Sequence, residues 1–504
     1  MPHPPVSAAK PTSADDWTAL GMAASGRGDR EHAITCFEQA LQLATDSPTA
    51  QCNLGLALHQ ARQFERAHRV LTQVVSHTPQ HAQGWFLLGN VCMSQQTWAE
   101  ARDAYTQALH LCGPDAALLR NRSVAHLQCH DLDAARADCH ASLQQSPHLA
   151  PTWQNLGLIE RERGALAESL AAYDRALALD PDSADAHADR AWTYLLQGDY
   201  ALGWQEYVWR WKKPMFALPP ALLELPVWQG QPLAGRSILI HCEQGLGDTL
   251  QFCRFAHGVA ARGARVALAV QPPLAGLLSA NFSEPIAVFA TDTPLPRCDF
   301  RCGLLDLPRL LAATSEPFVG AQGYLRANPA TRPSWAPSGS APVALRVGLV
   351  WRGSHRHPND HRRSTALADW LACLPVGPHY GVLQADLTDG ERAALSARAD
   401  MHLPELQISD WNATAALVSA LDVVVTVDTS MAHLAGALGT PTWVLLPYAP
   451  DWRWQLQRAD SPWYSGVRLF RQSAPGQWAQ PLQAMANALA AWQASTEKAR
   501  ATQR

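Results

Sequence analysis

One short segment has the residue types and spacing of an anion-binding site. An apolar stretch, Val423–Val427, leads directly into Asp428, Thr429 and Ser430, and a helical pattern begins at that point. Hydroxyl groups and the free N–H groups of a helix N-terminus together bind phosphate. His433 follows Thr429 by one helical turn and shares its face of the predicted helix. The sequence predicts a phosphate site here, and the alternative is a capped helix start with a core histidine.

A dense group of basic side chains follows another predicted strand, Arg346–Trp351. Four arginines and three histidines lie within thirteen residues of the chain. Guanidinium groups bind anions well, and the carboxyl end of a parallel strand is where open α/β sheets hold ligands. Arg352, Arg362 and Arg363 are the anion-binding candidates, and a solvated basic loop is the alternative.

A third cluster follows the predicted strand Ser237–His241. Gly245 and Gly247 permit a tight turn that brings backbone N–H groups close to a ligand. Glu243 and Asp248 place carboxylates beside this turn, and either could act as a general base. The loop lacks the lysine of a P-loop and the full dinucleotide fingerprint. A plain turn with an aspartate N-cap is the alternative.

An aromatic segment follows the predicted strand Thr442–Leu446. Three tryptophans and one tyrosine lie with Arg453 inside the segment 450–464, where a connecting loop is normally small and polar. One interpretation is an aromatic plug that packs the loop onto its domain. The other is that Arg453 or Trp454 lies against a nucleotide, which suits a flat apolar face and a cation.

Strands alternate with helices through the second half of the chain, which predicts parallel sheets. An amphipathic helix is expected from about Thr249 to Arg262, and a Pro/Ser/Ala segment, Asn328–Pro342, separates two strand sets. Two Rossmann-like halves facing across a cleft are therefore predicted. The further expected strands are Arg265–Val270, Ile286–Ala290 and Tyr380–Gln384.

The first half repeats with a period of about 34 residues, which is typical of helical-hairpin arrays. Small residues let two antiparallel helices approach, a large residue follows four positions after an alanine of constant phase, and proline ends the second helix. The pattern resembles the tetratricopeptide repeat and predicts an α-solenoid. The phase is marked by Leu20-Gly21, Leu54-Gly55 and Leu88-Gly89, by Ala33, Ala67 and Ala101, and by Phe37, Leu71 and Tyr105.

The predicted fold class is therefore α plus α/β, with an N-terminal solenoid followed by paired Rossmann-like domains. The predicted domains are a disordered N-terminus at 1–13, about six repeats at 14–216, a first Rossmann-like half at 217–327, a linker at 328–342, a second half at 343–495 and a tail at 496–504.

Composition limits the classes of function. The 504 residues carry a net charge of −4, which gives no basic field to attract nucleic acid. No apolar run is long enough for a membrane span, and the N-terminus lacks the pattern of a signal or transit peptide. We therefore expect a cytoplasmic protein whose 11 cysteines are reduced thiols in the core.

Residues 226 to about 480 resemble the family 9 glycosyltransferases, which include lipopolysaccharide heptosyltransferases. The whole chain is similar to bacterial proteins that fuse tetratricopeptide repeats to such a domain. The stretches that carry the resemblance are EQGLGDTLQFCRF, VGLVWRGS with HPNDHRRS, VDTSMAHLAGALGTPTWVLLP and PDWRWQLQRADSPWYSGVRLFRQ.

The resemblance implies a GT-B fold and inverting transfer from a nucleotide-diphosphate sugar bound by the second half. It implies that Asp248 is the general base, with Glu243 as the competing carboxylate. Contacts to donor phosphate and ribose fall on Asp428, Thr429, Ser430 and His433, and assistance to the diphosphate falls on Arg352, Arg362 and Arg363.

We expect neither a metal nor another cofactor in this reaction. Metal-dependent transferases of the other main fold carry Asp-x-Asp after a strand, and here that pattern occurs only in turns of the repeats, at Asp131/Asp133 and Asp180/Asp182. The predicted function is sugar transfer to an acceptor, for which the first Rossmann-like half is the expected side. The solenoid's concave face is expected to bind a protein or peptide, which it could present as that acceptor. The alternative is a repeat-based scaffold with a weakly active or inactive transferase domain.

Overall fold

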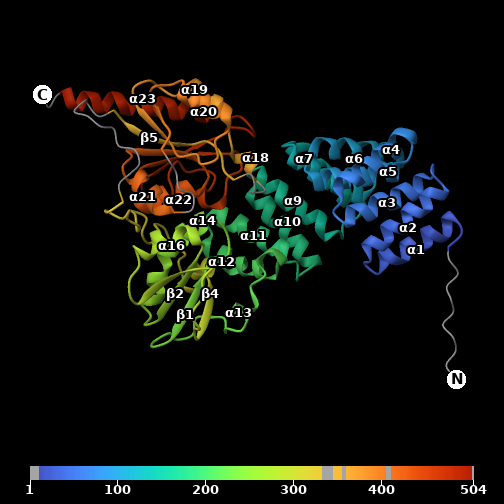
Figure 1. Ribbon diagram of the computed structural model, residues 1–504, viewed down its shortest axis with the longest axis horizontal. Helices are drawn as coiled ribbons and strands as arrows, with labels where there is room; N and C mark the ends of the chain where they lie inside the picture. Colours follow the sequence, from blue (N-terminus) through green and yellow to red (C-terminus); the bar gives the residue numbers. More distant parts are fainter. Residues whose placement is uncertain (1–10, 332–343, 355–358, 405–409, 502–504) are drawn as a thin grey trace. The chain divides into compact units, whose positions relative to one another are not determined.

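The computed structural model describes residues 11–331, 344–354, 359–404 and 410–501 (Figure 1). Contacts divide the chain into two compact units, Met1–Asp182 and Ser183–Arg504, which we call the first and second units. Most of the predicted N-terminal disorder, most of the predicted linker, and His357 with Pro358 of the basic cluster lie outside the described residues. Within those residues, no helix is both long enough and apolar enough to span a membrane.

The first unit is a run of antiparallel helical hairpins, drawn in blue to teal in Figure 1. Each hairpin packs on the next, so that neighbouring pairs bury a continuous core. The helices are α1 Ala14–Gly26, α2 Arg30–Leu43, α3 Pro48–Gln60, α4 Phe64–His77, α5 Ala82–Gln95, α6 Trp98–Cys112, α7 Ala116–Gln128, α8 Leu132–Gln145, α9 Ala150–Glu162 and α10 Leu166–Leu179.

The repeat period arises from packing inside each hairpin. A Cβ atom on Gly89 of α5 would lie 2.5 Å from the Tyr105 ring of α6, so only glycine lets these helices meet. The same close approach joins Gly21 to Phe37 and Gly55 to Leu71. Each large residue therefore sits on the glycine of its own hairpin.

The second unit opens with helical segments that pack against both of its sheets. Trp204 of α12 lies edge-on to Phe252 at a ring-centroid distance of 6.0 Å and to Trp452 at 5.3 Å. These opening segments are α11 Ala184–Gln197, α12 Tyr200–Tyr207, the 3₁₀ turns η1 Val208–Lys212 and η2 Pro214–Phe216, and α13 Pro220–Leu223.

The first sheet is parallel, in the order β3-β2-β1-β4. Strands β1, β2 and β3 have the predicted bounds, whereas the single helix expected at 249–262 is three shorter segments. The elements are β1 Ser237–His241, α14 Leu246–Phe252, η3 Cys253–Phe255, α15 Ala256–Ala260, β2 Arg265–Val270, α16 Pro272–Ser279, β3 Ile286–Ala290, β4 Phe300–Gly303, η4 Leu304–Asp306 and α17 Leu307–Leu310.

The second sheet is also parallel, in the order β10-β9-β8-β5-β6-β7, so the second unit is α/β. Its central strands β8 and β9 are buried along their whole length. The elements are β5 Arg346–Val350, α18 Asp360–Arg363, α19 Leu367–Cys373, β6 His379–Val382, α20 Asp389–Ser396, β7 Met401–His402, α21 Trp411–Ser419, β8 Val423–Val427, α22 Ser430–Leu438, β9 Thr442–Leu446, η5 Trp452–Trp454, β10 Val467–Arg471 and α23 Ala479–Ala501.

Candidate functional site

The first turns of α14 and α22 lie against each other, which joins two of the predicted clusters (Figure 1). Helix α14 follows β1 of the first sheet, and α22 follows β8 of the second. A Cβ atom on Gly247 would lie 2.8 Å from the His433 ring and 3.4 Å from the Ser430 Cα. The glycine therefore allows the turn of one sheet to meet the Asp-Thr-Ser segment of the other.

Asp248 is held in place beside this contact. Its Oδ2 accepts a hydrogen bond from the Gly245 N–H at 2.8 Å, and its Oδ1 accepts one from Arg453 Nη2 at 2.5 Å. Burial raises the pKa of Asp248, although the Arg453 cation opposes that rise. A carboxylate with a raised pKa is a stronger base than an exposed one.

Arg453 is a buried cation that ties the two sheets together. Its side chain is 8% exposed and donates to Gln251 of α14 and to Asp451 as well as to Asp248. The guanidinium carbon lies 4.2 Å from the Trp452 ring centroid. The two carboxylates balance the charge of the arginine, as a buried cation requires.

His433 is buried and Asp428 is partly buried, and removal from water shifts each towards its neutral form. Burial, with the neighbouring Asp451 carboxylate, raises the pKa of Asp428 to about 6. Burial, with nearby arginines, lowers the pKa of His433 well below its ordinary value. His433 Nδ1 lies 2.9 Å from the Tyr464 hydroxyl, and its ring stacks on Trp454.

The two hydroxyl residues occupy the start of α22. Thr429 is the N-cap, and its Oγ1 accepts a hydrogen bond from the Met431 N–H at 3.3 Å. It also lies 3.1 Å from the Thr426 hydroxyl. Ser430 is the first helical residue. The predicted anion seat is therefore a helix N-terminus, although the Thr429 hydroxyl is already engaged in capping.

The structure separates the three predicted arginines. Arg363 donates from Nη1 to the Asp428 carbonyl at 2.6 Å and so reaches the site. Arg352 pairs with Glu391 and donates to the Asp386 carbonyl instead. Although burial opposes it, the hydrogen bond from Arg352 lowers the pKa of Glu391 to about 2. Arg362 is half-buried on α18.

Glu243 belongs to a different buried cluster. Arg210 of η1 donates to both of its oxygens, at 2.6 and 2.9 Å, and also pairs with Asp306 at 2.9 Å. The Leu305 N–H donates to Glu243 Oε1 at 2.9 Å. Burial raises the pKa of Glu243, while Arg210 opposes that rise. Both oxygens of Glu243 are therefore engaged inside the protein.

The aromatic segment is core. The side chains of Trp452, Trp454 and Trp463 are fully buried, and Tyr464 is 1% exposed. Trp463 stacks on Phe318 at a centroid distance of 3.7 Å. This geometry supports the interpretation of the segment as a plug, in which Trp454 backs His433 and Arg453 anchors Asp248.

A cavity of about 600 Å³ lies on the first sheet, beneath the segment that carries η2 and α13. Its lining includes Leu239 and His241 of β1 and Ala269 of β2, which places it towards the carboxyl ends of these strands. Burial lowers the pKa of His241 to about 4, so this side chain is neutral. The lining is mixed: apolar side chains supply somewhat more than half of it, and Glu224, Glu243 and Arg297 are also part of it.

Several residues of the site were not predicted from the sequence. Asp451 lies inside the PDWRW stretch, whose position after a strand was the available signal. Gln251 and Tyr464 also lie in stretches already singled out. Arg210 gave no signal, because it lies where the repeat pattern fades and its partners, Glu243 and Asp306, are distant in the chain.

Two family models match the first half of the chain. The family described as cytochrome c-type biogenesis protein H TPR domain matches residues 8–117, and the family described as TPR repeat matches residues 157–198.

Among curated proteins, Protein FlbA of Caulobacter vibrioides is 26% identical over 512 residues, which span 95% of this chain and 84% of FlbA. Protein O-mannosyl-transferase TMTC1 of Homo sapiens is 26% identical over 168 residues, 32% of this chain and 19% of that protein. Tmtc3 of Drosophila melanogaster, a protein of the same description, is 30% identical over 27% of this chain and 15% of its own length.

Solved structures similar to this chain include the APC/C hetero-tetramer Cut9-Hcn1, with a TM-score of 0.37, 18% identity and coverage of 40% of this chain and 41% of that one. MamA from Desulfovibrio magneticus RS-1 has a TM-score of 0.32, 16% identity and coverage of 35% of this chain and 99% of that one. The family matches and the helical hairpins agree, and the N-terminal region is a run of tetratricopeptide repeats.

Proposed function

We propose that the protein is an inverting, metal-independent glycosyltransferase of the GT-B type, acting in the cytoplasm on a nucleotide-diphosphate sugar. The observation that carries the proposal is the contact between the first turns of α14 and α22. It puts the turn that carries Asp248 beside the helix N-terminus that follows β8 of the other sheet. A base and an anion seat at the junction of two parallel sheets are what this reaction needs.

In this proposal Asp248 accepts the proton of the acceptor hydroxyl while that oxygen attacks the anomeric carbon. The bond from the anomeric carbon to the diphosphate oxygen breaks, and the sugar inverts its configuration. The departing diphosphate gains negative charge beside the N–H groups at the start of α22 and beside Arg363. Asp248 is favoured over Glu243 because its side chain is 18% exposed, whereas that of Glu243 is 1% exposed and bound by Arg210 and Leu305.

The cavity on the first sheet is the proposed acceptor side. It lies on the half opposite to the proposed donor seat within the second unit, and Glu243 is part of its lining. The tetratricopeptide repeats are proposed to bring a protein or peptide acceptor. Partial similarity to proteins named O-mannosyl-transferases supports a transferase that acts on protein, although it spans only 15–19% of their length.

The proposal is tested with the full chain and a panel of UDP-, GDP- and ADP-sugars. A bound donor should stabilise the folded protein by about 2.7 kcal/mol at a hundred times its dissociation constant, which raises the melting temperature. The best donor should then give transfer, measured as nucleotide release and by mass spectrometry of modified proteins. Arg468→Ala is the control for nonspecific nucleotide binding, because it removes a cation to which the proposal gives no role. Arg468 lies on β10, and its guanidinium packs over Trp443 and Phe470.

A second candidate function is a scaffold with an inactive transferase domain. The observation that favours it is that both oxygens of Asp248 already have partners, Arg453 and the Gly245 N–H, which compete with an acceptor hydroxyl. If no donor changes the melting temperature, the scaffold is the better description.

A further inference from the structure

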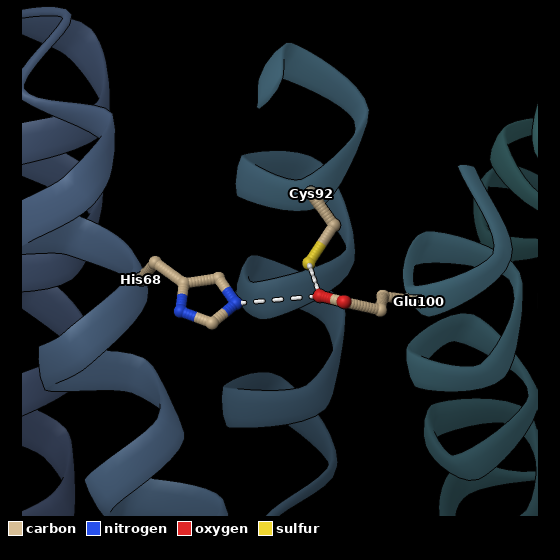
Figure 2. A group of neighbouring side chains, drawn as sticks. All are labelled: His68, Cys92 and Glu100. Atoms are coloured by element: carbon tan, nitrogen blue, oxygen red, sulfur yellow. Dashed lines mark hydrogen bonds and ion pairs between the residues drawn. The ribbon is translucent and has the colours of Figure 1, made fainter. Parts of the chain in front are cut away.

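Three side chains with metal-ligand chemistry converge between successive hairpins of the solenoid (Figure 2). His68 comes from α4, Cys92 from α5 and Glu100 from α6. The His68 Nε2 atom lies 3.6 Å from Glu100 Oε2, and Cys92 Sγ lies 3.9 Å from the same oxygen. All three ligand atoms lie within 4.8 Å of one another. In the part of the chain that the structure describes, this is the one such group of three.

The repeat register explains why these positions meet. His68 and Cys92 each have an equivalent residue one repeat earlier in the chain and another two repeats later. The earlier pair is Ile34 and Leu58, both buried in the core. The later pair is Arg136 and Glu160, an ion pair at 2.6 Å. The solenoid therefore brings these two repeat positions together, and here it presents an imidazole and a thiol.

The distances suit a small tetrahedral cation. Bond lengths of about 2.3 Å to sulfur and 2.0–2.2 Å to nitrogen or oxygen put tetrahedral ligand atoms about 3.4–3.6 Å apart. The two observed separations to Glu100 need to shrink by only a few tenths of an ångström. Side-chain rotation of Glu100 supplies this movement, because that side chain is 64% exposed. The third separation, from His68 to Cys92, is at most 4.8 Å, and it closes only if the His68 side chain, which is 32% exposed, also rotates.

We propose that His68, Cys92 and Glu100 form a binding site for a divalent cation of the zinc class. Thiolate, imidazole and carboxylate are the ligand set that selects Zn²⁺ over Mg²⁺ or Ca²⁺. On binding, the Cys92 Sγ–H proton leaves to solvent and a sulfur–metal bond forms, with no change of oxidation state. Three protein ligands leave a fourth position for water on the exposed side of Glu100.

Such a cation would join two hairpins. His68 belongs to the hairpin α3–α4, while Cys92 and Glu100 belong to α5–α6. A shared ion therefore stabilises the solenoid by linking two neighbouring hairpins. At the equivalent place two repeats later, the Arg136–Glu160 ion pair links the hairpins. The site lies within the first unit, so it has no part in the transfer reaction proposed for the second.

The test uses the full chain with Zn²⁺ in calorimetry and with Co²⁺ in absorption spectroscopy. Binding of one Zn²⁺ and a thiolate-to-cobalt charge-transfer band are expected. The variants are Cys92→Ser, His68→Ala and Glu100→Gln. Each should weaken Zn²⁺ binding by at least the roughly 10- to 100-fold that loss of an outer-shell partner costs, and Cys92→Ser should remove the charge-transfer band.

Cys112→Ser is the matched control, because Cys112 is an exposed thiol of the same solenoid. It should leave both signals unchanged. Since Cys92 is buried and its variant could unfold, His68→Ala and Glu100→Gln keep the test decisive. A charge-transfer band that survives Cys92→Ser but disappears in Cys112→Ser overturns the proposal, as does unchanged Zn²⁺ affinity in His68→Ala.

Discussion

Asp248 of α14 and Arg453 of η5 form a largely buried ion pair between elements that follow strands of different sheets. Burial raises the pKa of the carboxyl group, and the guanidinium restrains that rise. The orientation of the carboxylate is fixed at both oxygens, because Arg453 donates to one and the Gly245 N–H donates to the other. Burial and Arg453 therefore set the basicity of the proposed catalytic residue, and Arg453 and the Gly245 N–H set its position.

Replacing Asp248 with Asn should reduce sugar transfer by about 10²- to 10⁴-fold, the usual contribution of a general base. Donor binding should persist, because the start of α22 is unchanged. The measurement is initial rate together with donor affinity by calorimetry. Glu243→Gln is the contrasting variant: it should melt earlier, since it weakens the Arg210 cluster, while its folded fraction keeps its turnover. Substantial turnover in Asp248→Asn would reassign the base.

The partly buried Asp428 should make stability depend on pH. Its pKa is raised from 3.8 to about 6 in the folded protein, so the folded state holds the proton more tightly than the unfolded state. This contribution to stability is present in full below pH 3.8 and is lost as the pH rises through about 6. Asp428→Asn should therefore melt higher than the parent at pH 7, and the difference should vanish near pH 4. His433, whose pKa is lowered, changes stability with pH in the opposite direction. Because the parent and Asp428→Asn both contain His433, its effect cancels when their melting temperatures are compared. A constant difference across this range would contradict the assignment.

At this scale the sequence located most of the candidate site. The Gly-Asp turn, the Asp-Thr-Ser segment and the PDWRW stretch all meet around Arg453. The sequence could not separate Asp248 from Glu243, because their difference depends on a partner, Arg210, far away in the chain. Nor could it show that Arg352 is held by Glu391 across the loop.

The contact between α14 and α22 is the element that assembles the proposed site. It depends on a residue without a side chain, since any Cβ at Gly247 would lie 2.8 Å from the His433 ring. That ring is held between Trp454 and the Tyr464 hydroxyl, so it cannot turn aside easily and the helices have to shift.

Gly247→Ala should therefore lower stability by about 1–3 kcal/mol, as overpacking does, and should reduce transfer. Gly245→Ala is the matched control two residues away. Its backbone has φ −71°, and its Cβ would meet only Asp248 Oδ2, at 3.4 Å. The melting temperatures and transfer rates of Gly247→Ala and Gly245→Ala are compared. If both quantities are equal in the two variants, the contact between α14 and α22 does not depend on glycine at 247.

The plug has its own energetic consequence. Trp454 is fully buried and stacks on His433. Its truncation to alanine should cost about 3–5 kcal/mol of folding free energy, seen as a lower denaturant midpoint. If Trp454→Ala instead keeps its stability and loses donor affinity, the indole is a ligand contact rather than packing.

Among the elements, the strands missed by the sequence share one property. Strands β4, β7 and β10 all lie at the edges of their sheets, whereas, of the predicted strands, β1, β2, β5, β6, β8 and β9 are interior and β3 is an edge strand. An interior parallel strand is buried on both faces and appears as a continuous apolar run. The edge strand Val467–Arg471 contains Arg468 and Arg471, so it lacks a continuous apolar run. In place of the single helix expected at 249–262, the chain forms α14 and α15 with the 3₁₀ turn η3 between them.

The whole chain should unfold in two steps, one for each compact unit. Scanning calorimetry with and without ligand tests this. A nucleotide sugar should raise only the transition that Trp454→Ala lowers, because both act on the second unit. Zn²⁺ should raise only the other transition. A single transition moved by both ligands would mean that the units unfold together.

The ion pairs of Arg210 with Glu243 and Asp306 determine which truncated forms of this protein keep their stability. A fragment starting at residue 217, where the repeat pattern has ended, would keep Glu243 and Asp306 but lose the guanidinium between them. Removing one partner of a buried ion pair costs about 3–5 kcal/mol, a large share of a domain's stability. A fragment starting at Ser183 retains that cation and the Trp204 contacts. Any gene fusion or domain exchange that moves the α/β part intact must therefore carry the last helical hairpin with it.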